Sequence, residues 1–129
     1  WHPDCGCCEL WQDHLRGDGF EVASHPVPEV GHHRRLLGTP SNLLSCHAAR
    51  VDWLVLEGHV PAHAILRALS QPGSGLRGLS VPAMPIGSPG MEIDGVEPEI
   101  YGVIAWDQLG RQWTFLTMQG DLPVYRQAD

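Results

Sequence analysis

The sequence predicts an α/β fold on three observations. Short apolar segments with the alternation of β-strands are interspersed with segments of helical periodicity, and a Cys5-x-x-Cys8 pair stands at the start of the first helix. Such a pair at a strand-to-helix junction is typical of thioredoxin-like domains. A length of 129 residues suits one core. We therefore predict a single thioredoxin-like domain over residues 1–129, with a mixed central sheet flanked by helices. Because only four residues precede Cys5, we expect the first strand to be largely truncated.

The first helix is predicted from Cys7 to Arg16. Apolar side chains recur there at helical spacing, and a Gly-Asp-Gly segment follows as a stop signal. Residues 20–23 alternate apolar and polar side chains, which predicts a short strand. Residues 30–37 are predicted to form a shorter helix that ends at Gly38.

Two strands and the clearest helix are predicted for the middle of the chain. Apolar runs at residues 48–51 and 53–56 indicate neighbouring strands around a tight turn near Asp52. Residues 61–71 begin with proline, carry apolar residues at helical spacing and end at Gln-Pro-Gly. These are the signals of a complete helix with one face in the core.

A long loop and a hairpin are predicted for the last third of the chain. Residues 73–95 are rich in Gly, Pro and Ser, with few apolar residues, so we expect a long ordered loop that contains Met84 and Met91. Loops of that length in small domains usually serve a function. Residues 101–106 and 112–116 predict the two strands of a hairpin.

The charge balance argues against nucleic-acid and anionic-membrane partners. Eight basic residues oppose fifteen acidic ones, which gives a net charge of −7, and the basic residues are scattered. No apolar run approaches the roughly 20 residues that span a bilayer, so no membrane span is expected. An acidic surface together with eight histidines suits cations instead.

Four cysteines are the main candidates for chemistry: Cys5, Cys7, Cys8 and Cys46. The start of a helix favours thiolate over thiol, which suits either a redox motif or a soft-metal site. Thiolates select Cu(I), and thiolate sets also bind zinc. On a helical turn Cys5 and Cys8 face the same way while Cys7 is rotated away. Bridging thiolates in a small multinuclear Cu(I) cluster use all three better than a single tetrahedral zinc does, so we favour copper over zinc.

Cys46 is expected to join the site from a distant part of the chain. In thioredoxin-like domains the segment that enters the third strand lies against the C-x-x-C loop. Adjacent strand residues point to opposite faces, so we favour Cys46 over His47 as a ligand. Two roles remain open for His47: metal ligand, or hydrogen-bonded residue that orients its neighbour.

The thioethers of Met84 and Met91 are further candidate donors. On a loop rich in Pro and Gly, a thioether can serve as an exchangeable Cu(I) donor or as a hydrophobic lid, and both readings stay open. Trp11 is expected to shield the site from water. We expect His14 to pack or to cap a helix, and His59 to lie at the surface.

Five uncommon motifs follow one another along the chain. They are C-G-C-C-x-x-W-x-x-H-L from Cys5, G-x-P-x-x-L from Gly38, S-C-H from Ser45, E-G-H-V-P-A from Glu57 and V-P-x-M-P-x-G-S-P-G-M-E from Val81. In this order they resemble the CopG-type family of bacterial copper-resistance proteins. The resemblance covers nearly the whole chain up to residue 118, and any single motif would be weak alone.

The resemblance implies a periplasmic, thioredoxin-like protein that binds copper through its cysteines and exchanges Cu(I) with Cu(II). A copper oxidoreductase is the enzyme activity that such an exchange would represent. Copper ions and other periplasmic copper-handling proteins are then the expected partners. The alternative is a thiol-disulfide oxidoreductase in which Cys5 attacks and Cys8 resolves. Cys7 and Cys46 favour copper, because a plain dithiol enzyme needs neither. A structural zinc module is the least favoured function, since the predicted fold has its own core.

Overall fold

The computed structural model describes residues 6–22, 38–43, 47–71, 74–82 and 85–124. Its centre is a six-stranded mixed sheet in which the spatial order of the strands equals their order in the chain. The strands are β1 (Ala48–Val51), β2 (Leu54–Gly58), β3 (Leu76–Val81), β4 (Ile100–Asp107), β5 (Gln112–Gln119) and β6 (Leu122–Pro123). The helical elements within these ranges are α1 (Gly6–Gly17), the 3₁₀ turn η1 (Ser41–Leu43) and α3 (Ala62–Leu69). The predicted mixed α/β architecture is confirmed.

The strand directions follow from the connections. β2 and β3 pair in parallel, because α3 carries the chain back across the sheet between them, and every other neighbouring pair is antiparallel. The tight turn between β1 and β2 contains Asp52 at φ 51°, a left-handed conformation that aspartate tolerates. Both predicted hairpins and the predicted helix at residues 61–71 are therefore confirmed, with shifts of a few residues at their ends.

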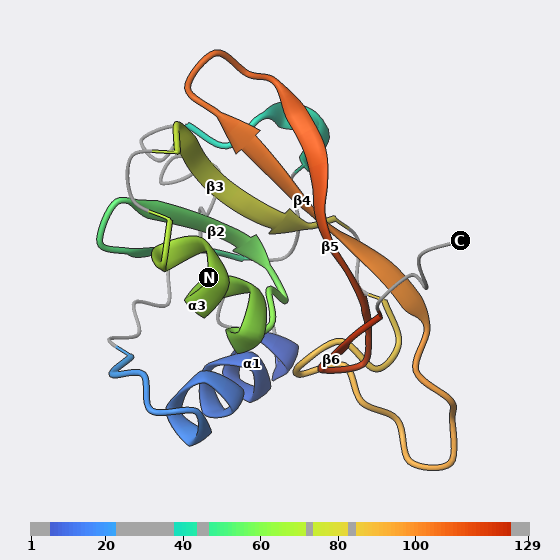
Figure 1. Cartoon of the computed structure of the whole chain (residues 1–129). Helices are drawn as coiled ribbons and strands as arrows, with labels where there is room; N and C mark the ends of the chain where they lie inside the picture. The colour runs from blue at the N-terminus through green and yellow to red at the C-terminus, as the bar shows by residue number, and fades with distance from the viewer. Residues whose placement is uncertain (1–5, 23–37, 44–46, 72–73, 83–84, 125–129) are drawn as a thin grey trace.

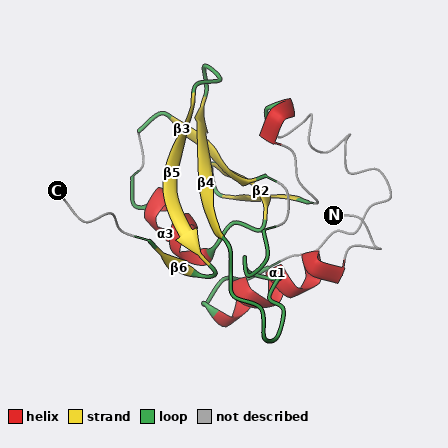
Figure 2. Ribbon diagram, turned by 90° about the vertical axis from the view of Figure 1, so that its right-hand side faces the viewer, coloured by secondary structure: helices red, strands yellow, loops and turns green. Residues whose placement is uncertain are grey.

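Core side chains divide between the two faces of the sheet. Leu54 and Leu56 belong to the large cluster formed with α1 and α3, whereas Val55 packs with Leu43 and Trp106 on the other face. This division follows from the alternation of side chains along a strand. Figures 1 and 2 show α3 over one face and η1 over the other, with α1 beside the sheet at its lower end.

The prediction of one loop over residues 73–95 is wrong, because β3 runs through it as a central strand between β2 and β4. Its glycine made the segment resemble a loop. A Cβ at Gly78 would lie 2.3 Å from the ring of Trp106, so a packed indole occupies the space that a side chain would fill. Glycine here marks a close approach inside a strand. The true loop of this region runs from β3 to β4.

The short strand predicted at residues 20–23 is also wrong for its described part. Residues 20–22 pair with no strand, and Phe20 instead donates its amide to the Leu15 carbonyl at the end of α1. Phe20 and Val22 still pack on the core, which explains their apolar character. The helix predicted at residues 30–37 and the truncated first strand lie outside the described residues. None of the helices in the described ranges combines the length and the apolarity that a membrane crossing requires.

Candidate metal centre

Helix α1 places Cys8 against the sheet. Cys8, Trp11 and Leu15 recur at the spacing of one helix face and are 0%, 3% and 3% exposed, whereas Leu10 on the opposite face is 56% exposed. Cys8 lies in the first turn of α1, where the helix dipole favours a thiolate. In the structure its sulfur is part of a disulfide whose other half lies outside the described side chains.

His47 contacts Cys8. Its Nδ1 lies 3.1 Å from Cys8 Sγ, and the ring is 2% exposed. The His47 carbonyl accepts a hydrogen bond from the Gly58 amide at 2.8 Å, which ties this residue to the end of β2. Once the disulfide is reduced, an imidazole N–H at this distance stabilises the thiolate, and the same two groups are good ligands for soft metal ions.

Trp11 packs against the ring of His47. The indole and imidazole centroids are 4.4 Å apart with an interplanar angle of 38°. Trp11 Nε1 donates a buried hydrogen bond of 2.7 Å to the Val60 carbonyl, which fixes the orientation of the ring. The indole thus packs on His47 beside the fully buried Cys8, a position compatible with the predicted shielding of the site from water.

His59 is fully buried, so the expectation that it lies at the surface is wrong. β2 ends at Gly58 with φ 76°, and the Val60 amide donates to the Gly58 carbonyl, so the chain turns and directs His59 inward. Its ring meets that of His47 edge to face at a centroid distance of 5.0 Å. The glycine at the end of the strand is the one local signal that could have indicated this turn.

The Pro89 carbonyl selects the tautomer of His59. The distance from Nδ1 to this oxygen is 2.6 Å, and because a carbonyl can only accept, Nδ1 carries the hydrogen and Nε2 carries the lone pair of the neutral ring. Burial lowers the pKa of His59, while the Pro89 hydrogen bond and the negative charge of Glu92 oppose that shift. Burial thus favours the neutral form of His59, the form in which an imidazole can act as a metal ligand.

Two solved structures resemble this chain over almost its full length. "Copper resistance protein copG", Form 1, has a TM-score of 0.84 and 35% sequence identity, and the match covers 92% of this chain and 93% of that one. Form 2 has the same TM-score and identity and covers 91% and 92%. This chain belongs to the CopG family of copper resistance proteins.

A family model described as "Protein of unknown function, DUF411" matches residues 43–91. This segment runs from η1 to the loop after β3 and contains both histidines of the buried centre. No curated protein matches the chain. The CopG relationship therefore rests on whole-chain structural similarity with substantial identity, in agreement with the motifs seen in the sequence.

In this CopG-family chain His14 contacts the start of α3, unlike His47 and His59, whose rings contact each other. Its Nε2 accepts a hydrogen bond of 3.2 Å from the backbone amide of Ala62, the first residue of α3. Pro61 precedes that residue and offers no side-chain cap. An imidazole from α1 thus replaces the usual serine or aspartate cap of α3. The expected packing or capping role of His14 is compatible with this contact.

The loop after β3 contributes Met91 near the centre. Met91 is half-buried and closes a turn, with its amide bonded to the Ser88 carbonyl at 2.7 Å and its carbonyl bonded to the Gly87 amide at 2.9 Å. Pro89, which bonds His59, lies within the same turn. The turn therefore brings the backbone of Met91 close to the buried histidines.

The side chains of the other predicted ligands lie outside the part of the chain that the structure describes. Cys5, Cys46 and Met84 fall in the residues that the structure does not describe, and Cys7 lies in α1 without a described side chain. Within the described ranges, no group of three or more His, Cys, Asp or Glu side chains could hold a metal ion. The metal-ligand set thus remains a prediction, and the structure adds the arrangement of Cys8, His47 and His59.

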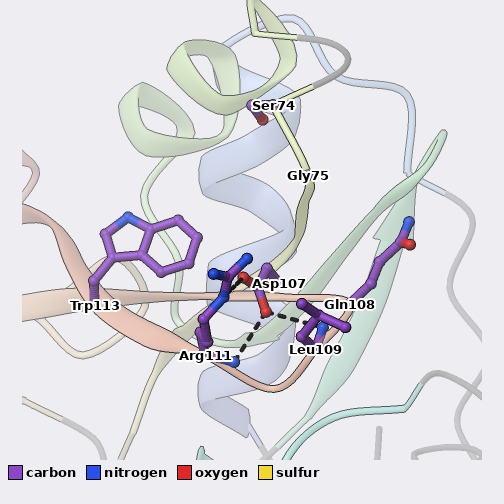
Figure 3. Close-up of a pocket in the computed structure, with 7 residues that line it drawn as sticks. All are labelled: Ser74, Gly75, Asp107, Gln108, Leu109, Arg111 and Trp113. Carbon is purple, nitrogen blue, oxygen red and sulfur yellow. Dashed lines mark hydrogen bonds and ion pairs between the residues drawn. The ribbon is translucent and has the colours of Figure 1, made fainter.

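A surface pocket of about 380 Å³ lies at the tip of the β4–β5 hairpin (Figure 3). Arg111 Nε bonds Asp107 Oδ2 at 2.7 Å, and the partly exposed indole of Trp113 also lines the pocket. The second oxygen of Asp107 accepts hydrogen bonds from two backbone amides of the turn. The hairpin tip and α1 lie at opposite ends of the molecule (Figure 1). The carboxylate is thus committed to the turn, and the pocket contains none of the predicted site residues.

Proposed function

We propose that this protein binds copper as part of bacterial copper resistance, through a thiolate-rich site built around Cys8. Family membership supports the role, since the similar structures are titled copper resistance proteins. The observation that carries the proposal to these residues is the buried contact of 3.1 Å between Cys8 Sγ and His47 Nδ1. A sulfur and an imidazole nitrogen in a water-excluded position are a donor set for a soft metal ion.

The full ligand set that we propose comprises the four cysteines with His47 and the two loop methionines: Cys5, Cys7, Cys8, Cys46, His47, Met84 and Met91. Thiolates can bridge Cu(I) ions, so several ions per chain form a small cluster over the start of α1. Copper is then the cargo of the site. The disulfide at Cys8 has to be reduced before its sulfur becomes a thiolate ligand.

We also propose a thioredoxin-like fold, a periplasmic location and interconversion of Cu(I) and Cu(II). The position of Cys8 at the first turn of α1, below the end of a mixed sheet, supports the fold. The disulfide supports an oxidising compartment. Copper carriers of the same compartment are the partners that this function requires.

Anaerobic loading of the reduced protein with Cu(I), a wash with a mild chelator and copper K-edge absorption test the proposal. We expect more than one retained copper per chain, with sulfur shells and a short metal-metal distance. Cys8→Ser should retain fewer ions, whereas the exposed His63→Gln serves as a control and should retain all of them. A ratio of one copper per chain would refute the cluster, and retention of zinc but not copper would refute the copper function.

The disulfide at Cys8 also favours a second function, thiol-disulfide exchange. In that mechanism the Cys5 thiolate attacks a substrate disulfide, and Cys8 attacks the mixed disulfide and releases the reduced substrate. Reduction of insulin by the metal-free protein, with dithiothreitol as the electron source, tests it. Turnover that disappears in Cys8→Ser would support this function, and absence of turnover in the unmodified protein would contradict it.

A further inference from the structure

Apolar side chains are exposed at the end of the sheet where β6 lies. Ile100 and Leu122 are 62% and 68% exposed, and both pair in register with Gln119 of the strand between them. Residues paired in register point to the same face. Val124, whose amide bonds the Thr117 carbonyl at 2.7 Å, extends this face by one further row. The end of the sheet thus exposes the apolar side chains of Ile100 and Leu122 in one row, with the polar Gln119 between them.

The loop between β3 and β4 carries two more exposed apolar side chains, in the segment that leads into Ile100. Ile93 and Val96 are 48% and 46% exposed and lie on one turn, in which the Val96 amide bonds the Ile93 carbonyl at 3.1 Å. Figure 1 shows this loop projecting beyond the end of the sheet where β4 begins. We call the five residues of the row and the turn the apolar end: Ile93, Val96, Ile100, Leu122 and Val124.

The loop that carries this surface is anchored at its neck. The Glu99 amide bonds the Ile86 carbonyl at 2.8 Å, and the Ile86 amide bonds the Glu99 carboxylate at 2.7 Å. The Pro98 carbonyl accepts a hydrogen bond from the Gln119 side chain at 3.1 Å, which ties the loop to β5. A surface on a loop held by three hydrogen bonds is formed before a partner arrives, which reduces the entropy cost of binding.

Negative charge surrounds the apolar end. Asp94, Glu97 and Asp121 are exposed next to its members in the chain, and their side chains make no hydrogen bond or ion pair among the described residues. No Arg, Lys or His occurs from Gly78 to Gly110. A second copy of this chain would bring these carboxylates against each other, so like charge opposes self-association here.

We propose that the apolar end is a docking surface for a small basic protein whose contact face has an apolar centre and a rim of lysines, the surface chemistry of c-type cytochromes. Carboxylates around an apolar centre complement such a face in charge and in hydrophobicity. The small number of apolar side chains predicts a weak, fast and salt-sensitive complex. The other arm of the loop contacts His59 through the Pro89 carbonyl, so the partner docks on the loop that borders the candidate centre.

Binding of the basic partner does not require copper. The docking proposal, which rests on the proposed function only for its purpose, can therefore fail while the copper-binding proposal holds, and the reverse. Metal-free ¹⁵N-labelled protein is titrated with ferric cytochrome c at about 20 mM and about 200 mM ionic strength, since screening lengths differ strongly between these values. We expect amide shifts confined to residues 92–100 and 119–124 at low salt, and their loss at high salt. Absence of shifts, or shifts centred on other residues, would overturn the proposal.

Two pairs of charge variants separate a local surface from net charge. We expect Asp94→Asn with Glu97→Gln to weaken binding by about tenfold at low salt, and the control Asp18→Asn with Glu21→Gln by less than about twofold. Both pairs remove two charges from exposed positions, and the control pair lies at the end of α1. Equal weakening by both pairs would overturn the proposal, because attraction would then depend on overall charge alone.

An apolar variant and its control complete the test. Ile93→Ser should weaken binding severalfold, whereas Leu66→Ser, which changes a residue 55% exposed on α3, should leave it unchanged. Sedimentation of the protein alone tests whether the apolar end instead binds a second copy of this chain. Self-association that Ile93→Ser abolishes would assign the surface to a second copy and would overturn the proposal.

Discussion

Replacement of Trp11 by phenylalanine tests how α1 is held over the sheet. The indole Nε1 donates a buried hydrogen bond of 2.7 Å to the Val60 carbonyl, and Val60 is fully buried. Phenylalanine retains an aromatic ring against His47 but has no donor, so the carbonyl loses this partner at a cost of about 1–3 kcal/mol. The smaller ring leaves a cavity that costs about 1 kcal/mol more. We therefore expect Trp11→Phe to lower the free energy of unfolding by about 2–4 kcal/mol.

Urea unfolding of the metal-free, disulfide-bonded protein measures this loss. With a slope of about 2 kcal/mol per molar urea, the midpoint should fall by about 1–2 M while the slope stays unchanged. Trp113→Phe is the matched control, since Trp113 is 42% exposed and makes no hydrogen bond through its indole within the described part of the chain. It should cost at most about 0.5 kcal/mol. Equal losses for the two variants would refute the idea that the Trp11 hydrogen bond anchors α1.

Three further substitutions test other contacts. His14→Ala removes the imidazole that caps α3 at Ala62 and should cost about 1 kcal/mol in urea unfolding; no loss would show that water replaces this cap. Gly78→Ala places a Cβ 2.3 Å from the Trp106 ring and should cost about 1–3 kcal/mol, seen as a lower Tm; an unchanged Tm would contradict the close approach. Because burial lowers the pKa of His59, the unfolded chain binds a proton at higher pH than the folded protein, so stability falls as pH decreases below about 6.5 toward the lowered pKa. His59→Gln should remove this part of the pH dependence of urea unfolding, and an unchanged pH profile would assign it to other groups.

The fold could be predicted where local signals agreed with the tertiary structure. α3 begins after a proline and buries one face, and the two hairpins have turns that their sequences favour. β3 could not be predicted, because the glycine in its middle is explained by the Trp106 ring of a neighbouring strand rather than by its own sequence neighbours. The two-residue β6 is defined by its pairing with β5 and has no periodicity of its own.

The candidate centre could be predicted in part. Cys8 and His47 were both proposed from the sequence, and the structure brings their side chains together across 39 positions of the chain. His59 was missed, because its inward orientation depends on the turn at Gly58 and on a carbonyl 30 residues away. Side chains placed by such distant partners leave little signal in a single sequence. The roles proposed for Cys5 and Cys46 stay predictions, since both residues lie outside the described ranges.

Residues on one face of α1 explain why a variant that loses copper does not by itself reveal whether the changed residue is a metal ligand or a residue that positions one. Three residues of α1, spaced three apart, contact the residues that flank the β1–β2 hairpin. Cys8 contacts His47, which precedes β1, whereas Trp11 contacts Val60 and His14 contacts Ala62, which both follow β2. Loss of either supporting contact shifts α1, and Cys8 shifts with it. Such a variant should still bind the full number of copper ions but release them faster to a chelator, whereas loss of a ligand lowers the number bound. Stoichiometry at saturation therefore identifies ligands, and release kinetics identify the residues that position them.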